Sequence, residues 1–218
     1  ITYKAFEIAA QRSNLPISII TPGTNKSEIF HALRNIASYY NQVILIGYPP
    51  FIKDLVDEAP KEGINLKKIN LRILFAAESF SEKFRDYIIK KTNIKNPYLN
   101  TLNIYGTADI GAMAYETPTS ILIRRLAVKN PKLFKDIFID VNKTPTLAQY
   151  NPFFITFESP NKEILLTGDN TIPLIRYAIG DHGGVVNFNE IDRILKDNNI
   201  NLQEEAQKNG IKKTITET

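Results

Sequence analysis

The spacing of hydrophobic residues alternates between two patterns over the first two-thirds of the chain. Helical spacing gives way repeatedly to short continuous apolar runs, which are typical of buried strands. The expected helices cover residues 3–12, 24–40, 50–58 and 81–92, a β-branched run covers 17–20, and the expected strands cover 42–47, 71–77 and 101–106. Thr24 or Asn25 could cap the second helix, and Ser81 the fourth. This alternation predicts an α/β fold with a mostly parallel sheet flanked by helices on both faces.

The pattern changes at about residue 120. Short β-rich segments separated by Pro, Gly and Asn follow, and residues 189–208 then return to helical spacing. The expected strands are 120–128, 153–159, 162–168, 172–180 and 183–188. We therefore divide the chain into a parallel-sheet part (1–120), a smaller β-rich, barrel-like unit (121–188), and a C-terminal helix and tail (189–218).

Composition excludes several classes of site. Cysteine is absent, which excludes thiolate chemistry and disulfides, and two histidines (His31 and His182) are too few for a multi-histidine metal site. No apolar run approaches the roughly 20 residues of a membrane span. The net charge of +4 comes from scattered lysines, which argues against nucleic-acid binding. Because the chain begins with Ile1 and has no secretory signal, we expect it to be part of a longer cytoplasmic protein.

Two segments with candidate chemistry follow expected strands. "AAES" (76–79) and "YGTAD" (105–109) lie at carboxyl ends of strands, where open parallel sheets bind ligands. The ring of Tyr105 could cover a flat heterocycle, Gly106 would allow close backbone approach, and Asp109 could hold Mg²⁺ beside phosphates. A strand–turn boundary with a solvated aspartate is the simpler alternative.

A second candidate is the pair Gly180-Asp181 in "PLIRYAIGDHGG" (173–184). An aspartate on a tight turn could accept hydrogen bonds from both hydroxyls of a ribose. Such turns also occur for conformational reasons alone, and "TGD" at 167–169 is a second example that we assign to a hairpin.

Other polar and aromatic residues could have either a functional or a structural role. Glu78 could be a ligand or an acid favoured by the dipole of the following helix. Tyr48 and Phe51 could line an apolar pocket or pack at a helix start. We interpret His31 as structural and place His182 at the edge of the site.

The order of these motifs resembles the adenylate-forming superfamily of acyl- and aryl-CoA ligases, adenylation domains and firefly luciferase. The closest likeness is to phenylacetate–CoA ligase-like proteins, over roughly residues 40–185. Its strongest element pairs "IYGTADIG" (104–111) with "LIRYAIGD" (174–181), about seventy residues further on. The resemblance implies ATP-dependent activation of a carboxylic acid to an acyl-adenylate, followed by transfer to coenzyme A.

Roles can be carried over from the family to matching positions of this sequence. Thr107 and Asp109 would be the catalytic residues, with Asp109 as the Mg²⁺ ligand. Among the nucleotide-binding residues, Tyr105 would stack on adenine next to Gly106, and Ala76, Ala77 and Glu78 would form the wall beside the base. Asp181 would bind the ribose hydroxyls. Arg176 and Tyr177 would support the turn that carries Asp181. The acyl pocket would be bordered by Tyr48, Phe51, Gly111 and Ala112.

Departures from the family pattern leave a second hypothesis open. Ala108 replaces a usual Thr or Ser, Asp109 a usual Glu, and Ala178 and Ile179 a usual Arg and Thr. The family's phosphate-binding loop and lysine-bearing lid are not found in this sequence, so we expect the chain alone to be inactive. The alternative is a non-catalytic nucleotide-binding or scaffold domain of the same fold; a flavodoxin-like module fits the late β-rich part less well. Expected partners are a small carboxylic acid, ATP or AMP, and coenzyme A, and a homodimer is compatible with the sequence.

Overall fold

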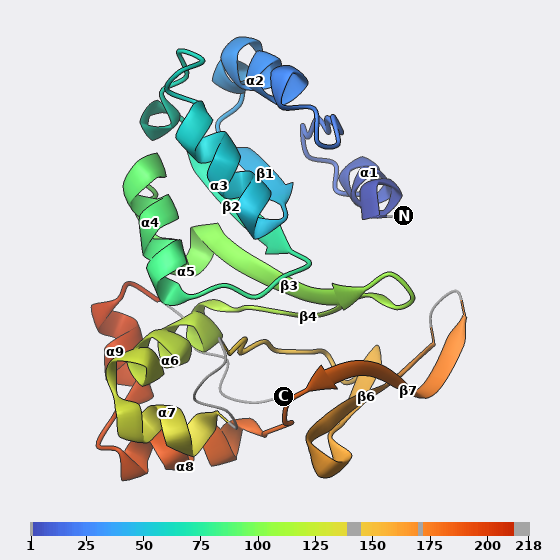
Figure 1. Ribbon diagram of the computed structural model, residues 1–218, viewed down its shortest axis with the longest axis vertical. Helices are drawn as coiled ribbons and strands as arrows, with labels where there is room; N and C mark the ends of the chain where they lie inside the picture. Colours follow the sequence, from blue (N-terminus) through green and yellow to red (C-terminus); the bar gives the residue numbers. More distant parts are fainter. Residues whose placement is uncertain (1, 139–144, 170–171, 212–218) are drawn as a thin grey trace.

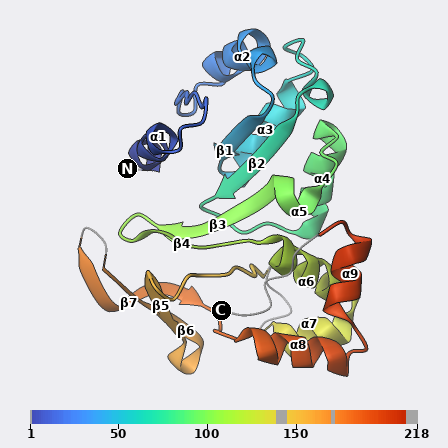
Figure 2. The ribbon, with the colours of Figure 1, turned by 180° about the vertical axis from the view of Figure 1, so that it is seen from behind.

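A computed structural model gives the structure of the chain and describes residues 2–138, 145–169 and 172–211. Figures 1 and 2 show it from two opposite sides. The helices are α1 (Thr2–Arg12), α2 (Lys26–Asn35), α3 (Pro49–Glu58), α4 (Glu82–Thr92), α5 (Pro97–Asn100), α6 (Pro118–Lys129), α7 (Pro131–Ile137), α8 (Phe188–Asp197) and α9 (Leu202–Lys208), with short 3₁₀ turns η1 (Ala37–Tyr39), η2 (Leu66–Lys68) and η3 (Pro160–Lys162).

The strands form two separate sheets. The first contains β1 (Val43–Gly47), β2 (Leu71–Ala76), β3 (Thr101–Thr107) and β4 (Gly111–Tyr115), and the second contains β5 (Ile155–Glu158), β6 (Glu163–Asp169) and β7 (Pro173–His182). The first sheet has the order β1-β2-β3-β4; its first three strands are parallel and β4 is antiparallel to β3. The second sheet is antiparallel throughout. The fold is therefore α/β with a mixed, mostly parallel sheet, as the hydrophobic pattern predicted.

The core of the parallel sheet lies on one face. Along β2, Leu71, Ile73 and Phe75 are buried and pack with apolar residues of α2, α3 and α4. The helices begin where the sequence provides caps: the Asn25 side chain accepts from the Glu28 N–H (3.3 Å) and Ser81 Oγ from the Phe84 N–H (3.2 Å). The alternation of buried and half-buried residues follows from the two-residue repeat of a strand.

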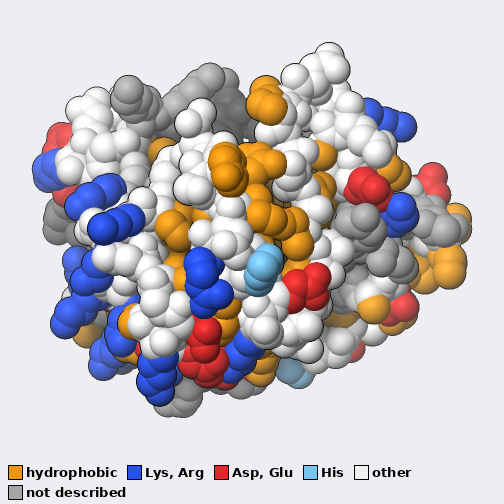
Figure 3. Space-filling model, turned by 90° about the horizontal axis from the view of Figure 1, so that it is seen from above, with side chains coloured by type: hydrophobic (Ala, Val, Ile, Leu, Met, Phe, Trp, Pro, Cys, Tyr) orange, Lys and Arg blue, Asp and Glu red, His pale blue; other side chains and the backbone are white. Residues whose placement is uncertain are grey.

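The opposite face of β1 is more open than we expected. Ile44 and Ile46 are 53% and 45% exposed, so helices do not cover both faces of the sheet at this edge in the described chain. Figure 3 views the molecule from above and shows hydrophobic side chains gathered in the middle of the face seen there, with many Lys and Arg side chains along one side. The run at 17–20 lies outside the strands of both sheets. Among the described residues, none of the helices has the length and apolar content needed to cross a bilayer.

The prediction of a strand at 120–128 is wrong, because this segment lies in helix α6. Thr117 and Ser120 form a capping box at its start, and Pro118 occupies the first turn, where its missing N–H has no cost. Ile121, Leu122 and Ile123 are all buried. A helix that is buried on most sides loses the periodic polar face, so its isoleucines resemble a strand. The β-rich unit that we placed at 121–188 therefore starts with two helices.

Three other boundaries differ from the sequence-based expectation. The helix expected over 24–40 ends at Asn35 and is followed by η1. The expected strand at 183–188 is absent from the described structure, where α8 begins at Phe188. The expected C-terminal helix is two helices, since Asn199 adopts a left-handed backbone (φ 58°) and Asn201 caps α9. Helices α5 to α9 share one apolar core around Leu133 and Leu195.

Candidate functional site

The carboxyl ends of β2 and β3 lie side by side. Ala76, the last residue of β2, pairs with Ile104, so the segment 76–78 runs beside Tyr105. The Asn103 side chain donates from Nδ2 to the carbonyl of Glu78 (3.2 Å) and holds this segment to β3. Ala77 has a left-handed backbone (φ 75°), a conformation that is strained for alanine. The two strand ends singled out in the sequence thus form one ledge at this end of the sheet.

Tyr105 links this ledge to the second sheet. Its phenol donates a hydrogen bond of 2.5 Å to Oδ2 of Asp181 on β7. The Tyr105 ring is half-buried and lies 6.3 Å from the Phe157 ring of β5, measured between centroids. Residues that are far apart in the sequence, from the "YGTAD" and "IRYAIGD" motifs, are therefore in direct contact.

A second bond of the same kind crosses between the sheets in the opposite sense. The Tyr177 phenol of β7 donates to Oδ2 of Asp109 (2.8 Å), which lies in the turn between β3 and β4. Each sheet thus contributes one tyrosine. One aspartate comes from the β3–β4 hairpin and the other from β7. Oδ1 of Asp109 and Oδ1 of Asp181 accept no hydrogen bond from the described residues, so each carboxylate keeps one oxygen for a ligand.

Both phenols are held in their protonated, donating form. Burial raises the pKa of Tyr105, and its hydrogen bond to the Asp181 carboxylate raises it further. The hydrogen bond to Asp109 likewise raises the pKa of Tyr177. The two phenols therefore act as hydrogen-bond donors and not as bases near neutral pH.

Gly106 is required by the fold of the hairpin. A β-carbon at this position would overlap with the carbonyl oxygen of Gly111 on β4. The register between β3 and β4 also shifts between Tyr105 and Gly106. The close approach that the glycine allows is therefore the approach of the neighbouring strand.

Gly180 and Asp181 lie within β7 and not in the turn that we expected. Leu165 pairs with Ala178 and Glu163 with His182, so β7 has two more residues than β6 between these pairs. Gly180 takes a left-handed backbone (φ 81°) in this bulge, and Asp181 follows it. The bulge presents the Asp181 carboxylate to Tyr105 of the other sheet. The assignment of "TGD" at 167–169 to a hairpin is confirmed, because Asp169 ends β6 and pairs with Pro173.

Arg176 lies beside the bulge, but its guanidinium is already paired and is not a free cation of the site. Its guanidinium forms an ion pair with Glu158 (Nε to Oε2, 3.2 Å) and its backbone N–H donates to Thr167 Oγ1 (2.9 Å). Its backbone is left-handed (φ 50°). Thr107, the other expected catalytic residue, accepts from the Ile110 N–H through Oγ1 (3.2 Å), which shapes the hairpin turn that carries Asp109.

The sequence did not identify the aromatic cluster beneath the site. Phe157 and Tyr150 lie 4.7 Å apart between ring centroids, and with Tyr105 they belong to the small core between the β3–β4 hairpin and the second sheet. A period-two pattern of aromatic and β-branched residues in "ITFE" (155–158) was the available signal. These rings fix the orientation of Tyr105.

A buried group of ionic residues lies behind β3. The Glu116 carboxylate accepts from Arg85 (Nη2 to Oε1, 2.8 Å), from Arg124 (Nη1 to Oε1, 3.0 Å) and from the backbone N–H of Asn103 (to Oε2, 2.9 Å). Arg85, Arg124 and Glu116 are at most 1% exposed. Glu82 completes the charge balance, with Oε2 3.0 Å from Arg85 Nε. This network ties α4 and α6 to the strand that carries Tyr105.

The expected acyl-pocket residues fall into two groups. Gly111 and Ala112 lie on β4 opposite Thr107 and Gly106. Tyr48 and Phe51 follow β1, with Tyr48 exposed at the start of α3 and Phe51 half-buried against the core of that helix. Among the described residues, no hydrogen bond or ring contact joins the two groups. His31 is exposed on α2, and His182 is exposed at the end of β7, one residue from Asp181.

The fit to Mg²⁺ depends on Asp109 alone. In the described part of the chain, no three carboxylate or imidazole side chains gather as a metal cage. Mg²⁺ commonly binds one or two carboxylates together with waters and substrate phosphates. The exposed Asp109 fits an ion delivered with a phosphate ligand, and the residues around it do not fit a permanently bound ion.

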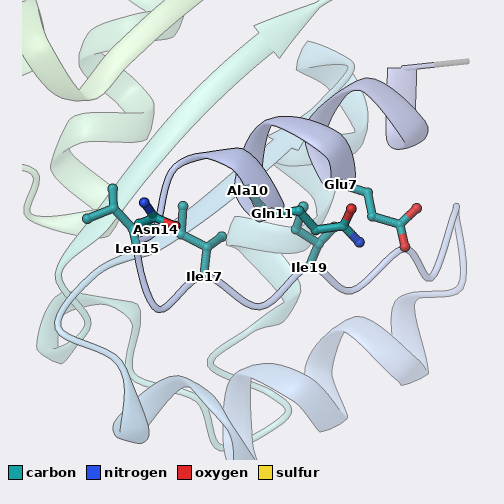
Figure 4. A pocket seen from close by; sticks show the side chains of 7 residues that line it. All are labelled: Glu7, Ala10, Gln11, Asn14, Leu15, Ile17 and Ile19. Carbon is teal, nitrogen blue, oxygen red and sulfur yellow. The ribbon is translucent and has the colours of Figure 1, made fainter.

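Two cavities lie away from these residues. One, of about 330 Å³, lies between α1 and the following segment and is lined by Leu15, Ile17 and Ile19 together with polar residues of the helix (Figure 4). The other, of about 230 Å³, lies at the amino end of β2.

The site has to be interpreted from its own geometry. The sequence matches no model of a known protein family, and no curated protein shows significant similarity to it.

Proposed function

We propose that this chain supplies the adenosine side of an ATP-dependent acid–thiol ligase, which activates a carboxylic acid as an acyl-adenylate and transfers it to coenzyme A. The observation that carries the proposal is the crossed pairing of Tyr105 with Asp181 and of Tyr177 with Asp109. The two motifs that suggested the family are in contact as such a site requires. The adenylate-forming fold, with its barrel-like second unit, is part of this proposal.

In the proposed site the adenine lies on the ledge of Ala76, Ala77 and Glu78 beside the Tyr105 ring. The ribose hydroxyls donate to Asp181, whose Oδ1 accepts nothing from the described residues. The Asp109 carboxylate lies at the hairpin turn, where the phosphates would extend. Mg²⁺ bound there would neutralise charge on the phosphates.

The reaction needs little covalent assistance from the protein. A carboxylate oxygen of the acid attacks the α-phosphorus of ATP in line, and the bond to pyrophosphate breaks. The thiol of coenzyme A then attacks the acyl carbon and releases AMP. Holding the adenosine at base and ribose fixes the α-phosphorus for attack, and such positioning contributes much of the rate.

Binding of AMP to this chain tests the adenosine site. We expect saturable binding by calorimetry, weakened at least about tenfold by Asp181→Ala, which corresponds to about 1.4 kcal/mol. Asp169→Ala is the matched control, because Asp169 also follows a glycine on the same hairpin but lies at its other end. Equal loss in both variants would contradict the ribose role of Asp181.

Chemistry is tested separately in the full-length protein by carboxylate-dependent exchange of pyrophosphate into ATP. The second candidate is a non-catalytic domain of the same fold. Two observations favour it. A tyrosine hydroxyl already binds one oxygen of each aspartate, and Ala108, beside Asp109, lacks the hydroxyl that the family usually has there. AMP binding without exchange activity with any acid would support it, and absence of AMP binding would exclude both nucleotide-binding hypotheses.

A further inference from the structure

A second polar cavity lies at the opposite end of the parallel sheet from the proposed adenosine site. It has a volume of about 230 Å³ and is formed where η2 leads into β2, where α4 ends and where α5 leads into β3. Leu71, the first residue of β2, lies at this cavity, and Ala76, the last, lies at the adenosine ledge. A strand of this length separates the two places by roughly 16 Å, at about 3.3 Å per residue.

The charge of the lining is entirely positive. Lys67, Lys68 and Lys95 line the cavity, and no carboxylate does. Within the described residues none of the three ammonium groups has an ion pair, and the only recorded contact is from Lys95 Nζ to Asn93 Oδ1 (3.0 Å). Three exposed lysines that line one small cavity and form no ion pair in the described chain give it a positive potential, which attracts anions.

Three amide side chains line the cavity: Asn70 donates from Nδ2 to the Asn41 carbonyl (2.8 Å), and the other two are oriented as donors without an acceptor among the described residues. Asn100 Oδ1 accepts from Arg72 Nε (2.9 Å) and Asn93 Oδ1 accepts from Lys95. Because Arg and Lys only donate, these contacts fix the oxygen of each amide. The Nδ2 groups of Asn93 and Asn100 have no acceptor in the described chain, so each offers two N–H donors.

The end of α4 does not cancel this potential. Carbonyls at a helix C-terminus carry partial negative charge and disfavour anions. Here the carbonyl of Ile88 accepts from Thr92 Oγ1 and that of Ile89 from the Asn93 N–H (2.8 Å in both cases). Of the last four carbonyls of α4 (residues 89–92), that of Ile89 is therefore already satisfied, and the full charges of three lysines outweigh the partial charge of the others.

We propose that this cavity is a binding site for a small phosphate-bearing anion, held by Lys67, Lys68 and Lys95 and by the amides of Asn93 and Asn100. The volume is below the 300–1,000 Å³ typical of pockets for larger organic ligands. The lining contains aliphatic but no aromatic side chains, so it has no ring on which a base could stack. A phosphate or diphosphate group fits these properties better than a nucleotide. The proposal is independent of the adenosine site.

The test uses inorganic diphosphate, added without ATP at low ionic strength and followed by calorimetry. We expect saturable binding to the chain, weakened at least about tenfold in the triple variant Lys67→Gln, Lys68→Gln, Lys95→Gln. The control triple variant Lys129→Gln, Lys132→Gln, Lys135→Gln loses the same charge from α6 and α7 and should bind like the parent. Equal loss in both variants, or no saturable binding at millimolar diphosphate, would overturn the proposal.

A second measurement does not depend on the folding of any variant. Lysine acetylation of the unmodified chain, read by mass spectrometry, should slow at Lys67, Lys68 and Lys95 when diphosphate is present. Acetylation at Lys129, Lys132 and Lys135 should not change. Unchanged acetylation at the first three lysines would also overturn the proposal.

Discussion

The phenol of Tyr105 and the carboxylate of Asp181 are joined by a hydrogen bond of 2.5 Å across 76 residues of sequence. The bond connects the last part of β3 to the bulge of β7, and the pair Tyr177–Asp109 connects the same two regions in reverse. Four side chains therefore fix how the two sheets meet at the candidate site. Because each bond uses one carboxylate oxygen, ligand binding and the contact between sheets are coupled.

A double-mutant cycle measures the first of these bonds. We expect Tyr105→Phe and Asp181→Asn each to destabilise the chain, with a coupling energy of about 1 kcal/mol, since hydrogen bonds to charged groups are stronger than neutral ones. Unfolding by urea gives the four free energies. The pair Tyr105→Phe with Asp109→Asn serves as the control and should be additive, because these two side chains are not bonded to each other. Coupling near zero in the first cycle would mean that the bond is not formed in solution.

The buried carboxylate of Glu116 gives a larger expected effect. Glu116→Gln should destabilise the chain by about 3–5 kcal/mol, because it leaves Arg85 and Arg124 with less negative charge in a buried site. Glu62→Gln is the control: Glu62 pairs with Arg34 at the surface, where both side chains are nearly half exposed, and should cost less than about 1 kcal/mol. Similar losses in the two variants would contradict the burial of the network.

Sequence patterns predicted the first half of the fold well because its signals are local. Ser81 begins α4 as predicted, and the continuous apolar runs of β1 to β3 are strands of a parallel sheet. The α6 segment was mistaken for a strand because its burial depends on partners distant in sequence, such as Glu82 for Arg124. Without that partner, two arginines within an isoleucine-rich run give no clear helical period.

The candidate site shows the same division. The types of residue at Tyr105, Asp109 and Asp181 could be recognised from the motifs. The crossed pairing of tyrosines and aspartates could not, because it depends on the bulge at Gly180 and on how β7 lies against the hairpin. The position of Phe157 beside Tyr105 likewise depends on the packing of two sheets.

Gly106 provides a test of the hairpin that carries the site. Gly106→Ala should destabilise the chain by more than about 2 kcal/mol, because the added methyl group overlaps with the backbone carbonyl of Gly111, which cannot rotate away. Gly47→Ala is the control, since its methyl group would lie 3.2 Å from Cδ1 of Ile52, the end of a flexible side chain. Thermal or urea unfolding compares the two. A smaller loss at Gly106 than at Gly47 would contradict the close pairing of β3 and β4.

The carboxyl group of Asp57 gives a prediction for acid conditions. Burial alone would raise its pKa, but hydrogen bonds from Lys53, Tyr87 and Lys91 outweigh this effect and lower the pKa from 3.8 to about 2. A lowered pKa means that folding favours the ionised form. The resulting stabilisation is therefore complete above the unfolded-state pKa near 3.8 and disappears as the pH falls through about 2.

Asp57→Asn should accordingly destabilise the chain at pH 7 and lose this effect in acid. The full shift corresponds to about 2 kcal/mol, but solvent screens a carboxyl group near the surface, so we expect about 1 kcal/mol at pH 7. The difference between parent and variant should shrink as the pH is lowered from about 4 to about 2, measured by urea unfolding. Asp192→Asn, which removes a surface pair with Lys196 on α8, should show at most a few tenths of a kcal/mol throughout. A difference at Asp57 that stays constant down to pH 2 would show that packing, and not the ionised carboxylate, joins α3 to α4 at this point.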